Sequence, residues 1–331
     1  MKRSTGVQYL AGTAIAAASL VIFFRGVDFA QLKRELVQGR VVTLAACAFL
    51  SVFALVFRAM RWKVMLPERD DAHRGGLFPY VMVGFMVNNV LPARIGEAAR
   101  ALLLWRKNGY PAFVSIGSLV LERFLDVVLF ISFFVVPVFV LGYTRPPIRS
   151  AAVVMGAIFI CSLVALVLYG LYPSRARRLG SAGLRVVPGR FRERAEKVAR
   201  ELASNLHWIS RPRKVLQTTV LSFAILLCYV VAIMFFLDDF GYTGLFRGMF
   251  VIAFAAMGAA IPLAPGYVGT MHAMLLQGLV IAGVGEERAR AVAILYHAFS
   301  YSPVTLLGLY YFFRTDITFK DISQARSTLD A

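Results

Sequence analysis

The sequence predicts an all-α integral membrane protein, and three observations lead to this fold class. Of the 331 residues, 59% are hydrophobic and only 16% are charged, whereas an average soluble domain carries about 25% charged residues. The mean hydropathy is +0.70. Apolar stretches long enough to cross a bilayer, which takes about 20 residues, recur along the whole chain. We therefore expect one polytopic membrane domain over residues 1–313 and a polar C-terminal tail over 314–331.

Six apolar stretches are predicted to cross the membrane fully. They lie at 7–24, 41–60, 112–141, 150–171, 215–237 and 290–313. The first follows Lys2 and Arg3, as the core of a signal peptide would. Its length of about 18 residues exceeds that of a usual signal-peptide core, so we interpret it as an uncleaved span.

Two further apolar stretches, 80–105 and 248–282, are interrupted by proline and glycine. The residues that make these breaks are Pro92, Gly96, Pro262, Pro265, Gly266 and Gly269. Proline removes a backbone donor and clashes with the preceding turn, and glycine lets the chain reverse. Each stretch is therefore predicted to be a re-entrant helical hairpin, with full crossing as the alternative.

The basic residues predict the orientation. The net charge is +18, and the loop 172–214 alone holds twelve Lys and Arg residues, which favours a cytoplasmic position. Counting outward from this loop places 25 basic residues inside and 9 outside, with the N-terminus inside. The inside count includes Arg58 and Arg61, assigned to a loop over 58–78, and Arg100 in the segment 100–107. We expect a multi-pass protein of the cell inner (plasma) membrane. The basic clusters indicate contact with anionic lipid, and no nucleic-acid-binding module is visible.

The order of the elements suggests an inverted repeat. Residues 1–141 read span, span, hairpin, span, and residues 150–313 read the same from the opposite side of the membrane. Paired interrupted helices in two halves of opposite topology are typical of transporters with a site near the bilayer midplane.

Three acidic residues, Glu97, Glu122 and Asp126, lie within apolar segments of the first half. A charge at the centre of a membrane helix costs at least about 2.5 kcal/mol, so each calls for a partner. Glu122 and Asp126 share one helical face at i,i+4, and Arg123 reaches Asp126 at i,i+3. Arg94 and Glu97 have the same i,i+3 spacing at the first break. These ion pairs would lock the hairpin to the 112–141 span. In a headgroup site, Arg94 and Arg123 would hold a phosphate, and the carboxylates would hold the arginines in place, bind an amine or hydroxyl groups, or carry a coupling proton. The two interpretations are compatible.

Further polar residues lie near the two breaks or on the segment that follows the second one. Asn88 and Asn89 precede the first break, where they would cap the freed backbone or bind hydroxyl groups of a ligand. In the second half, Tyr267, His272 and His297 would line a facing wall, together with Ser300 and Tyr301. The two histidines lie on neighbouring segments, where they either pair with each other or pack separately.

Several function classes lack their sequence signatures. The chain has no nucleotide-binding P-loop, HExxH, GxSxG or acidic DxD motif, and its three cysteines have no CxxC spacing. We therefore predict no metal, no cofactor and no catalytic residue. The alternative to a transporter is a membrane-embedded transferase or a non-transporting component of lipid or glycan assembly.

The run Asn88–Arg100, followed by Glu122-Arg123-Phe124-Leu125-Asp126, resembles the lysylphosphatidylglycerol synthase transmembrane-region family, whose members have a flippase-like domain. The run Pro262–Gly269 is similar to the later Pro-Gly block of that family. The resemblance implies transport of membrane lipids with anionic, aminoacylated or glycosylated headgroups, such as aminoacyl-phosphatidylglycerol or sugars on polyprenyl phosphate. It implies a substrate site formed by residues that match the family motif: Arg94, Glu97, Arg100, Glu122, Arg123 and Asp126.

This sequence departs from the family pattern at three positions. The family usually has Gly at Tyr267, Glu near His272 and Arg near His297, so an acid–base pair is replaced here by two histidines. No aminoacyl-transferase domain follows Arg314, so lysyl-lipid synthesis is not expected. The substrate lipid, the energy source and the oligomeric state stay open.

Overall fold

The computed structural model describes residues 41–68, 76–91, 94–172, 206–239, 241–261, 265–315, 317–318 and 321–322. This part of the chain forms helices and turns with no strand, which confirms the predicted all-α class. The predicted first span at 7–24, most of the 172–214 loop, and the break residues Pro92 and Pro262 lie outside the described residues.

Five long apolar helices have the length and composition to cross a membrane, as a multi-pass protein requires. They are α3 (Val41–Met65), α6 (Ala112–Val140), α7 (Pro146–Leu171), α10 (Pro212–Asp238) and α13 (Glu286–Phe312). Each corresponds to one predicted span. Proline occupies the first turn of α7 and α10, where its missing N–H would have no helical partner in any case.

Four shorter helices form two antiparallel hairpins, as predicted for the interrupted stretches. α4 (Phe78–Val90) packs on α5 (Gly96–Asn108), and α11 (Leu245–Ala260) packs on α12 (Thr270–Ile281). Both first helices end at a residue that precedes a proline: Leu91 has ψ 144° and Ile261 has ψ 102°. The residue before proline disfavours helical backbone, so the sequence itself sets where each hairpin turns. Short 3₁₀ turns at η2 (His207–Ser210) and η3 (Pro265–Tyr267) complete the described elements.

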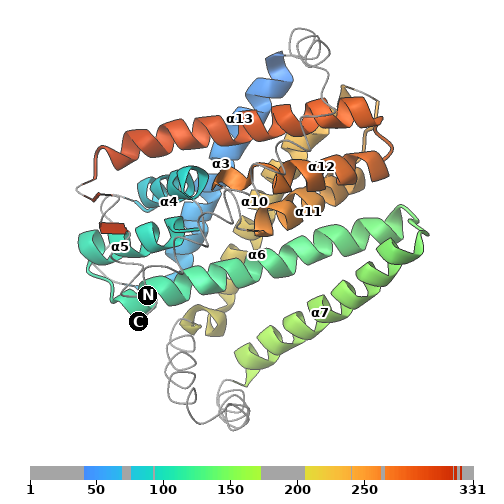
Figure 1. Ribbon diagram of the computed structural model, residues 1–331. Helices are drawn as coiled ribbons and strands as arrows, with labels where there is room; N and C mark the ends of the chain where they lie inside the picture. The colour runs from blue at the N-terminus through green and yellow to red at the C-terminus, as the bar shows by residue number, and fades with distance from the viewer. Residues whose placement is uncertain are drawn as a thin grey trace, which may run out of the picture.

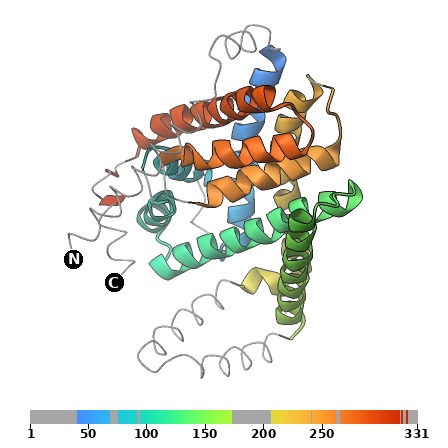
Figure 2. The ribbon, with the colours of Figure 1, turned by 45° about the vertical axis from the view of Figure 1, so that its right-hand side comes forward.

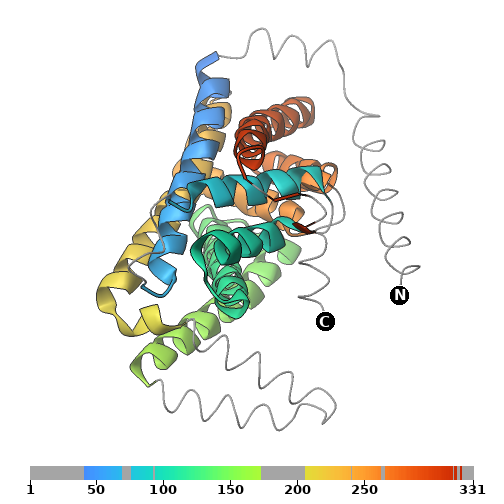
Figure 3. The ribbon, with the colours of Figure 1, turned by 90° about the vertical axis from the view of Figure 1, so that its left-hand side faces the viewer.

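The two hairpins approach each other from opposite ends of the molecule, and α6 and α13 run lengthwise beside them (Figure 1). α4 packs against α13, and α11 packs against α6, so each hairpin contacts the last long helix of the other half. α3 and α10 lie side by side over much of their length (Figure 3). These matched contacts are those expected of an inverted repeat, while the division into halves at 1–141 and 150–313 stays a prediction.

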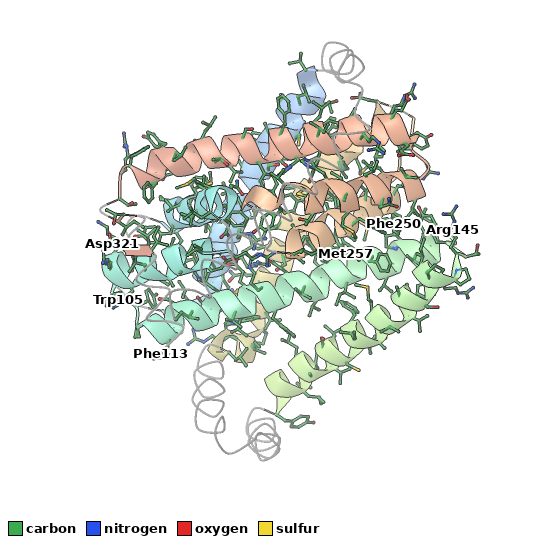
Figure 4. All side chains as sticks on the ribbon, viewed as in Figure 1. Trp105, Phe113, Arg145, Phe250, Met257 and Asp321 are labelled. Atoms are coloured by element: carbon green, nitrogen blue, oxygen red, sulfur yellow. The ribbon has the colours of Figure 1, made fainter. Side chains whose placement is uncertain are left out.

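The second hairpin sits in the larger apolar core. Phe250 of α11, labelled in Figure 4, stacks on Phe134 of α6 with ring centroids 5.8 Å apart. α7 packs mainly on α6 and diverges from the rest of the bundle (Figure 2). Trp105 and Asp321 lie at one end of the molecule and Arg145 at the other (Figure 4).

One boundary prediction was wrong in a way that matters for the site. The helix predicted over 41–60 continues to Met65, so Arg58 and Arg61 do not lie in an aqueous loop. They are 3% and 1% exposed, and Arg100 is 2% exposed. Because these three buried arginines do not belong to an aqueous loop, the number of basic residues assigned to the cytoplasmic side falls from 25 to 22, against 9 on the other side.

Candidate functional site

Glu122 and Asp126, one helical turn apart on α6, are the centre of a buried ion network. Arg58 bridges them, with Nη1 donating to Glu122 Oε1 at 2.8 Å and to Asp126 Oδ2 at 2.6 Å. Arg61 Nη2 donates to Asp126 Oδ1 at 2.6 Å, and its Nη1 donates to Ser222 of α10 at 3.0 Å. The predicted shared face of the two acids is confirmed. The network ties α3, α6 and α10 together.

Arg100 joins the first hairpin to this network. Its two terminal nitrogens donate to the two oxygens of Glu122, each at 2.9 Å, in a bidentate pair. The guanidinium also lies over the ring of Trp62, 4.2 Å from the centroid. Trp62 in turn donates to Ser118 at 2.9 Å. A lock between the hairpin and α6 is therefore present, and α3 is part of it. The predicted pair of Arg94 with Glu97 is not formed: Glu97 lies near Arg123, and Arg94 donates to the Ala259 carbonyl oxygen.

Arg123 differs from Arg58, Arg61 and Arg100 because the negative charges of Glu122 and Asp126 are already compensated without it. Its Nη2 donates to Glu122 at 2.9 Å, its Nη1 lies 3.6 Å from Asp126, and its Nε lies 3.9 Å from Glu97. Glu122 and Asp126 already accept short hydrogen bonds from Arg58, Arg61 and Arg100. Arg123 is 31% exposed along its side chain and lines a cavity. It can turn toward a ligand while Glu122 and Asp126 keep their other arginine partners and Glu97 keeps its hydrogen bond from Asn88.

Arg94 reaches the same cavity from the turn of the first hairpin. It donates to the carbonyl oxygen of Ala259 at the end of α11, and its guanidinium lies 5.4 Å from the ring centroid of Tyr267. The two hairpin tips therefore meet through these two residues. Both have left-handed backbone, with φ of 52° at Arg94 and 58° at Tyr267.

The Nε–H groups of Arg94 and Arg123 are buried and meet no hydrogen-bond acceptor in the described part of the chain. The same is true of Arg58, the third arginine that lines the cavity, and of Arg61 and Arg100, which do not line it. The unpaired Nε–H is therefore common to all five arginines and does not distinguish those at the cavity. Together the network and Arg94 comprise five arginines and three carboxylates, a surplus of two positive charges.

The cavity lies between the two hairpins and has a volume of about 220 Å³. Its charged and amide lining residues are Arg58, Arg94, Arg123, Asp126 and Asn89. The rest of the lining is mostly apolar and aromatic, with two serines, and comes from α3, α4, α6, α10, α11, η3, α12 and α13. Two lining residues on neighbouring helices, Val127 of α6 and Ala260 of α11, are exposed on the outer surface. The cavity therefore has an edge where α6 and α11 face the surroundings.

The two asparagines before the first break have different positions. The Asn88 Oδ1 accepts from the Gly96 N–H at 2.7 Å and its Nδ2 donates to Glu97 at 3.2 Å, so Asn88 caps the start of α5. Asn89 donates to Thr305 of α13 at 2.8 Å and lines the cavity. Glu97, Arg100 and Glu122 stand behind the cavity wall in the ion network and do not line it.

The histidines pair with each other, as one of the two interpretations predicted. His272 Nε2 and His297 Nδ1 are 2.7 Å apart, and His297 Nε2 is 2.9 Å from the Gly266 carbonyl oxygen. The Gly269 N–H donates to His272 Nδ1 at 3.4 Å. One consistent assignment therefore has each histidine neutral, donating from Nε2 and accepting at Nδ1. This chain of hydrogen bonds fastens the turn of the second hairpin to α13, behind Tyr301, whose ring lies 4.2 Å from that of His297.

Arg58 and Arg61 are the site residues that the sequence analysis missed. The predicted span ended at residue 60, and both arginines were assigned to the loop that follows it, although the helix continues to Met65. A signal was present: Arg58, Arg61, Trp62 and Met65 have the i, i+3, i+4, i+7 spacing of one buried helical face. The cavity also includes Tyr229, a residue of an otherwise apolar span that no motif marked.

Comparison with known proteins decides the family. A family model described as the lysylphosphatidylglycerol synthase TM region matches residues 9–308. The chain belongs to this family. Within it, the chain is similar to a UPF0104 membrane protein of Methanothermobacter thermautotrophicus, with 22% identity over 93% of this chain and 95% of that protein. A UPF0104 membrane protein of Methanocaldococcus jannaschii is 24% identical over 69% of this chain and 93% of its own length. No solved structure matches the chain.

Membership of the lysylphosphatidylglycerol synthase TM family agrees with the residues of the ion network. Four motif residues that carried the resemblance are linked through direct contacts: Arg100 contacts Glu122, and Arg123 contacts both Glu122 and Asp126. The described residues contain no group of three histidine, cysteine or acidic side chains placed to hold a metal ion.

Proposed function

We propose that this protein moves lipids with anionic headgroups between the two leaflets of the membrane, with the headgroup received in the cavity between the hairpin tips. The observation that carries the proposal is the set of three arginines, Arg58, Arg94 and Arg123, that line the cavity within a group of five arginines and only three carboxylates. A phosphate group presents several acceptor oxygens and a negative charge, which would pair with guanidinium groups at the cavity wall and offset the two surplus positive charges.

The shape of the cavity supports a lipid rather than a fully enclosed solute. A volume of about 220 Å³ equals that of about seven water molecules at roughly 30 Å³ each, enough for a headgroup but not for acyl chains. The chains would leave past Val127 and Ala260, where the cavity wall reaches the outer surface of the bundle. Membership of a membrane family named for a lipid synthase agrees with a lipid substrate.

The hairpin arrangement supports transport. Two interrupted helices that meet tip to tip from opposite ends are the transporter arrangement in which a central site is exposed alternately to the two sides. Rocking of one hairpin against the other would break the Arg94 contacts to Ala259 and Tyr267 on one side of the cavity. The buried network around Glu122 would move as one rigid unit with α3, α5 and α6.

A reconstituted assay tests this function. Purified protein in liposomes is supplied with fluorescent or isotopically labelled anionic lipids, and transfer between leaflets is measured for wild type, Arg94→Ala and Arg123→Ala. Loss of one charge-assisted contact to phosphate, about 1.5–3 kcal/mol, is expected to slow transfer about 10- to 100-fold. Arg106→Ala is the matched control, because Arg106 pairs with Asp321 at 3.1 Å on the surface.

Two outcomes count against the proposal. Wild-type protein that transfers none of the anionic lipids tested excludes the transporter. Formation of a new lipid product from a donor lipid, with Arg94→Ala inactive, favours the membrane-embedded transferase instead.

We propose further that the protein resides in the cell inner membrane with its N-terminus and the 172–214 loop in the cytoplasm. The excess of 22 basic residues over 9 supports this orientation. A single cysteine introduced into the 172–214 loop, in a background free of other cysteines, should resist an impermeant maleimide in intact cells and react after lysis. Labelling in intact cells would reverse the orientation.

A further inference from the structure

Four tyrosines gather around the cavity that holds the arginines. Tyr229 comes from α10, Tyr267 from the turn of the second hairpin, and Tyr296 and Tyr301 from α13. The rings of Tyr267 and Tyr301 lie edge to face, with centroids 6.3 Å apart. Ser51 and Ser300 line the same space. The second half of the chain thus supplies hydroxyl groups and aromatic faces where the first half supplies cations.

The carboxylates near the cavity are all engaged. Among the described residues that line it, Asp126 is the one acid, and its two oxygens accept from Arg61 and Arg58 at 2.6 Å each. Glu122 has no exposed side-chain surface and accepts from three arginines. Glu97 accepts from Asn88 and lies near Arg123, outside the cavity lining.

This distribution matters for headgroups that carry an amine. An ammonium group needs a carboxylate or several carbonyl oxygens to replace its hydration, and it is repelled by nearby cations in a poorly hydrated site. In this cavity an ammonium would meet three arginines and no carboxylate with a free oxygen. A hydroxyl group, in contrast, both donates and accepts, and it can pair with tyrosine and serine hydroxyls in either direction.

We infer that the cavity selects an anionic headgroup that carries hydroxyl groups, such as glycerol, inositol or a sugar attached to phosphate, and disfavours a headgroup that bears an added aminoacyl cation. The arginines hold the phosphate, and the tyrosines and serines hold the polyol, with the aromatic faces packing against its C–H surface. That the ligand is a lipid rests on the proposed function. The chemistry of a phosphorylated polyol is the same for a lipid headgroup and for a soluble phosphate.

Binding to the full-length protein in nanodiscs of phosphatidylcholine tests the inference. Native mass spectrometry compares phosphatidylinositol, phosphatidylglycerol, phosphatidic acid and lysyl-phosphatidylglycerol. Phosphatidylinositol and phosphatidylglycerol are expected to bind at least about tenfold more tightly than lysyl-phosphatidylglycerol. The cost of placing an ammonium group beside the arginines exceeds the free energy that corresponds to a tenfold change in affinity. Phosphatidic acid, which has phosphate without a polyol, should bind several-fold more weakly than phosphatidylinositol.

Two results overturn the inference. Equal or tighter binding of lysyl-phosphatidylglycerol refutes the exclusion of the cation. Equal binding of phosphatidic acid and phosphatidylinositol refutes the role of the hydroxyl groups.

Tyrosine variants assign the selectivity to this cavity. Tyr301→Phe and Tyr229→Phe remove one hydroxyl each and keep the ring, so the preference for phosphatidylinositol over phosphatidic acid should fall several-fold. Tyr310→Phe is the matched control, because Tyr310 lies on α13 with 48% exposure and does not line the cavity. An unchanged preference in both cavity variants would contradict the assignment.

Two further comparisons separate the possible failures. Competition by soluble glycerol phosphate or inositol phosphate at similar concentrations to the lipids would identify a soluble phosphate as the ligand. Selective binding without transfer between leaflets leaves the headgroup inference standing and refutes the transporter. Transfer of lysyl-phosphatidylglycerol at the same rate as phosphatidylglycerol refutes the headgroup inference and leaves the transporter standing.

Discussion

Arg94 and Tyr267 meet across the two hairpin tips, with the guanidinium of one 5.4 Å from the ring centroid of the other. They are also the two non-glycine residues with positive φ in the described part of the chain, at 52° and 58°. Left-handed backbone costs an ordinary residue about 1–2 kcal/mol, and such strain concentrates at functional sites. Each half of the chain therefore contributes one strained residue, and the two form a single contact at the cavity.

The left-handed backbone at Tyr267 predicts an unusual order of stabilities. Because glycine adopts φ near +58° without steric cost, Tyr267→Gly should be more stable than Tyr267→Ala by about 1 kcal/mol. Thermal unfolding in detergent measures the difference. Leu306 of α13, which is 66% exposed in a helix interior, serves as the control. There the order should invert, with Ala more stable than Gly by about 1 kcal/mol.

Alanine and glycine of equal stability at position 267 would contradict the strain. The same two variants also separate strain from ligand contact. Both lose the ring that Arg94 packs on, so both should lose lipid transfer to a similar degree even though their stabilities differ.

Glu122 is predicted to be the most sensitive acidic residue. Glu122→Gln leaves Arg58, Arg100 and Arg123 without the carboxylate that they share, and breaking a buried ion pair in this way costs about 3–5 kcal/mol. The free energy of unfolding, or the yield of monodisperse protein where folding fails, measures the loss. Double replacement with Arg100→Met should recover part of it, because one uncompensated charge is then removed.

Glu68 provides the matched control for Glu122. It also pairs with two cations, Arg211 at 2.7 Å and Lys214 at 2.8 Å, but its side chain is 67% exposed. Hydrogen bonds from Lys214 and Arg211 lower the pKa of Glu68, so the pairs persist at neutral pH. Because solvent screens exposed pairs, Glu68→Gln should leave the unfolding temperature unchanged. Equal losses in the two variants would mean that burial of the network is not what makes it essential.

The sequence predicted the framework of the site because its signals are local. A proline after Leu91 and another after Ile261 fix where the hairpins turn, and the i,i+4 spacing of Glu122 and Asp126 places both acids on one face. These features depend only on neighbouring residues and on helix geometry.

What sequence reasoning could not give is the identity of partners that are distant in the chain. Arg58 is 64 residues from Glu122, and the contact exists only because α3 crosses α6 in the folded bundle. Hydropathy alone assigns a charged residue at the end of an apolar stretch to water, so Arg58 and Arg61 were placed in a loop. The meeting of Arg94 with Tyr267 likewise depends on how the two hairpins approach each other.

Close packing within the first hairpin predicts that Gly96 cannot be replaced. A Cβ at Gly96 would lie 1.9 Å from the carbonyl oxygen of Gly84, which is backbone and cannot rotate away. Gly96→Ala should therefore force α4 and α5 apart and cost about 3 kcal/mol or more. Unfolding temperature and lipid transfer should both fall.

Gly156 of α7 is the control for this substitution. A Cβ there meets Val135 at 3.5 Å, an ordinary contact, in a helix interior where alanine is favoured over glycine. Gly156→Ala should leave both measurements unchanged or raise stability slightly. A Gly96→Ala protein as stable as Gly156→Ala would show that the hairpin does not close as tightly as described.

The histidine chain predicts coupled rather than additive losses. His272 and His297 form successive links between Gly269, Gly266 and α13, so replacing either breaks the whole chain. His272→Leu and His297→Leu should each cost about 1–3 kcal/mol, because the remaining ring keeps a buried polar nitrogen without its partner. The double variant should cost less than the sum of the two, with a coupling of about 0.5–3 kcal/mol.

Tyr110→Phe is the control for additivity, since the Tyr110 hydroxyl donates to the Pro67 carbonyl at 2.8 Å at the far end of the first hairpin. Combined with His297→Leu, it should give losses that add within about 0.5 kcal/mol. Additive losses for the two histidines would show that they pack independently.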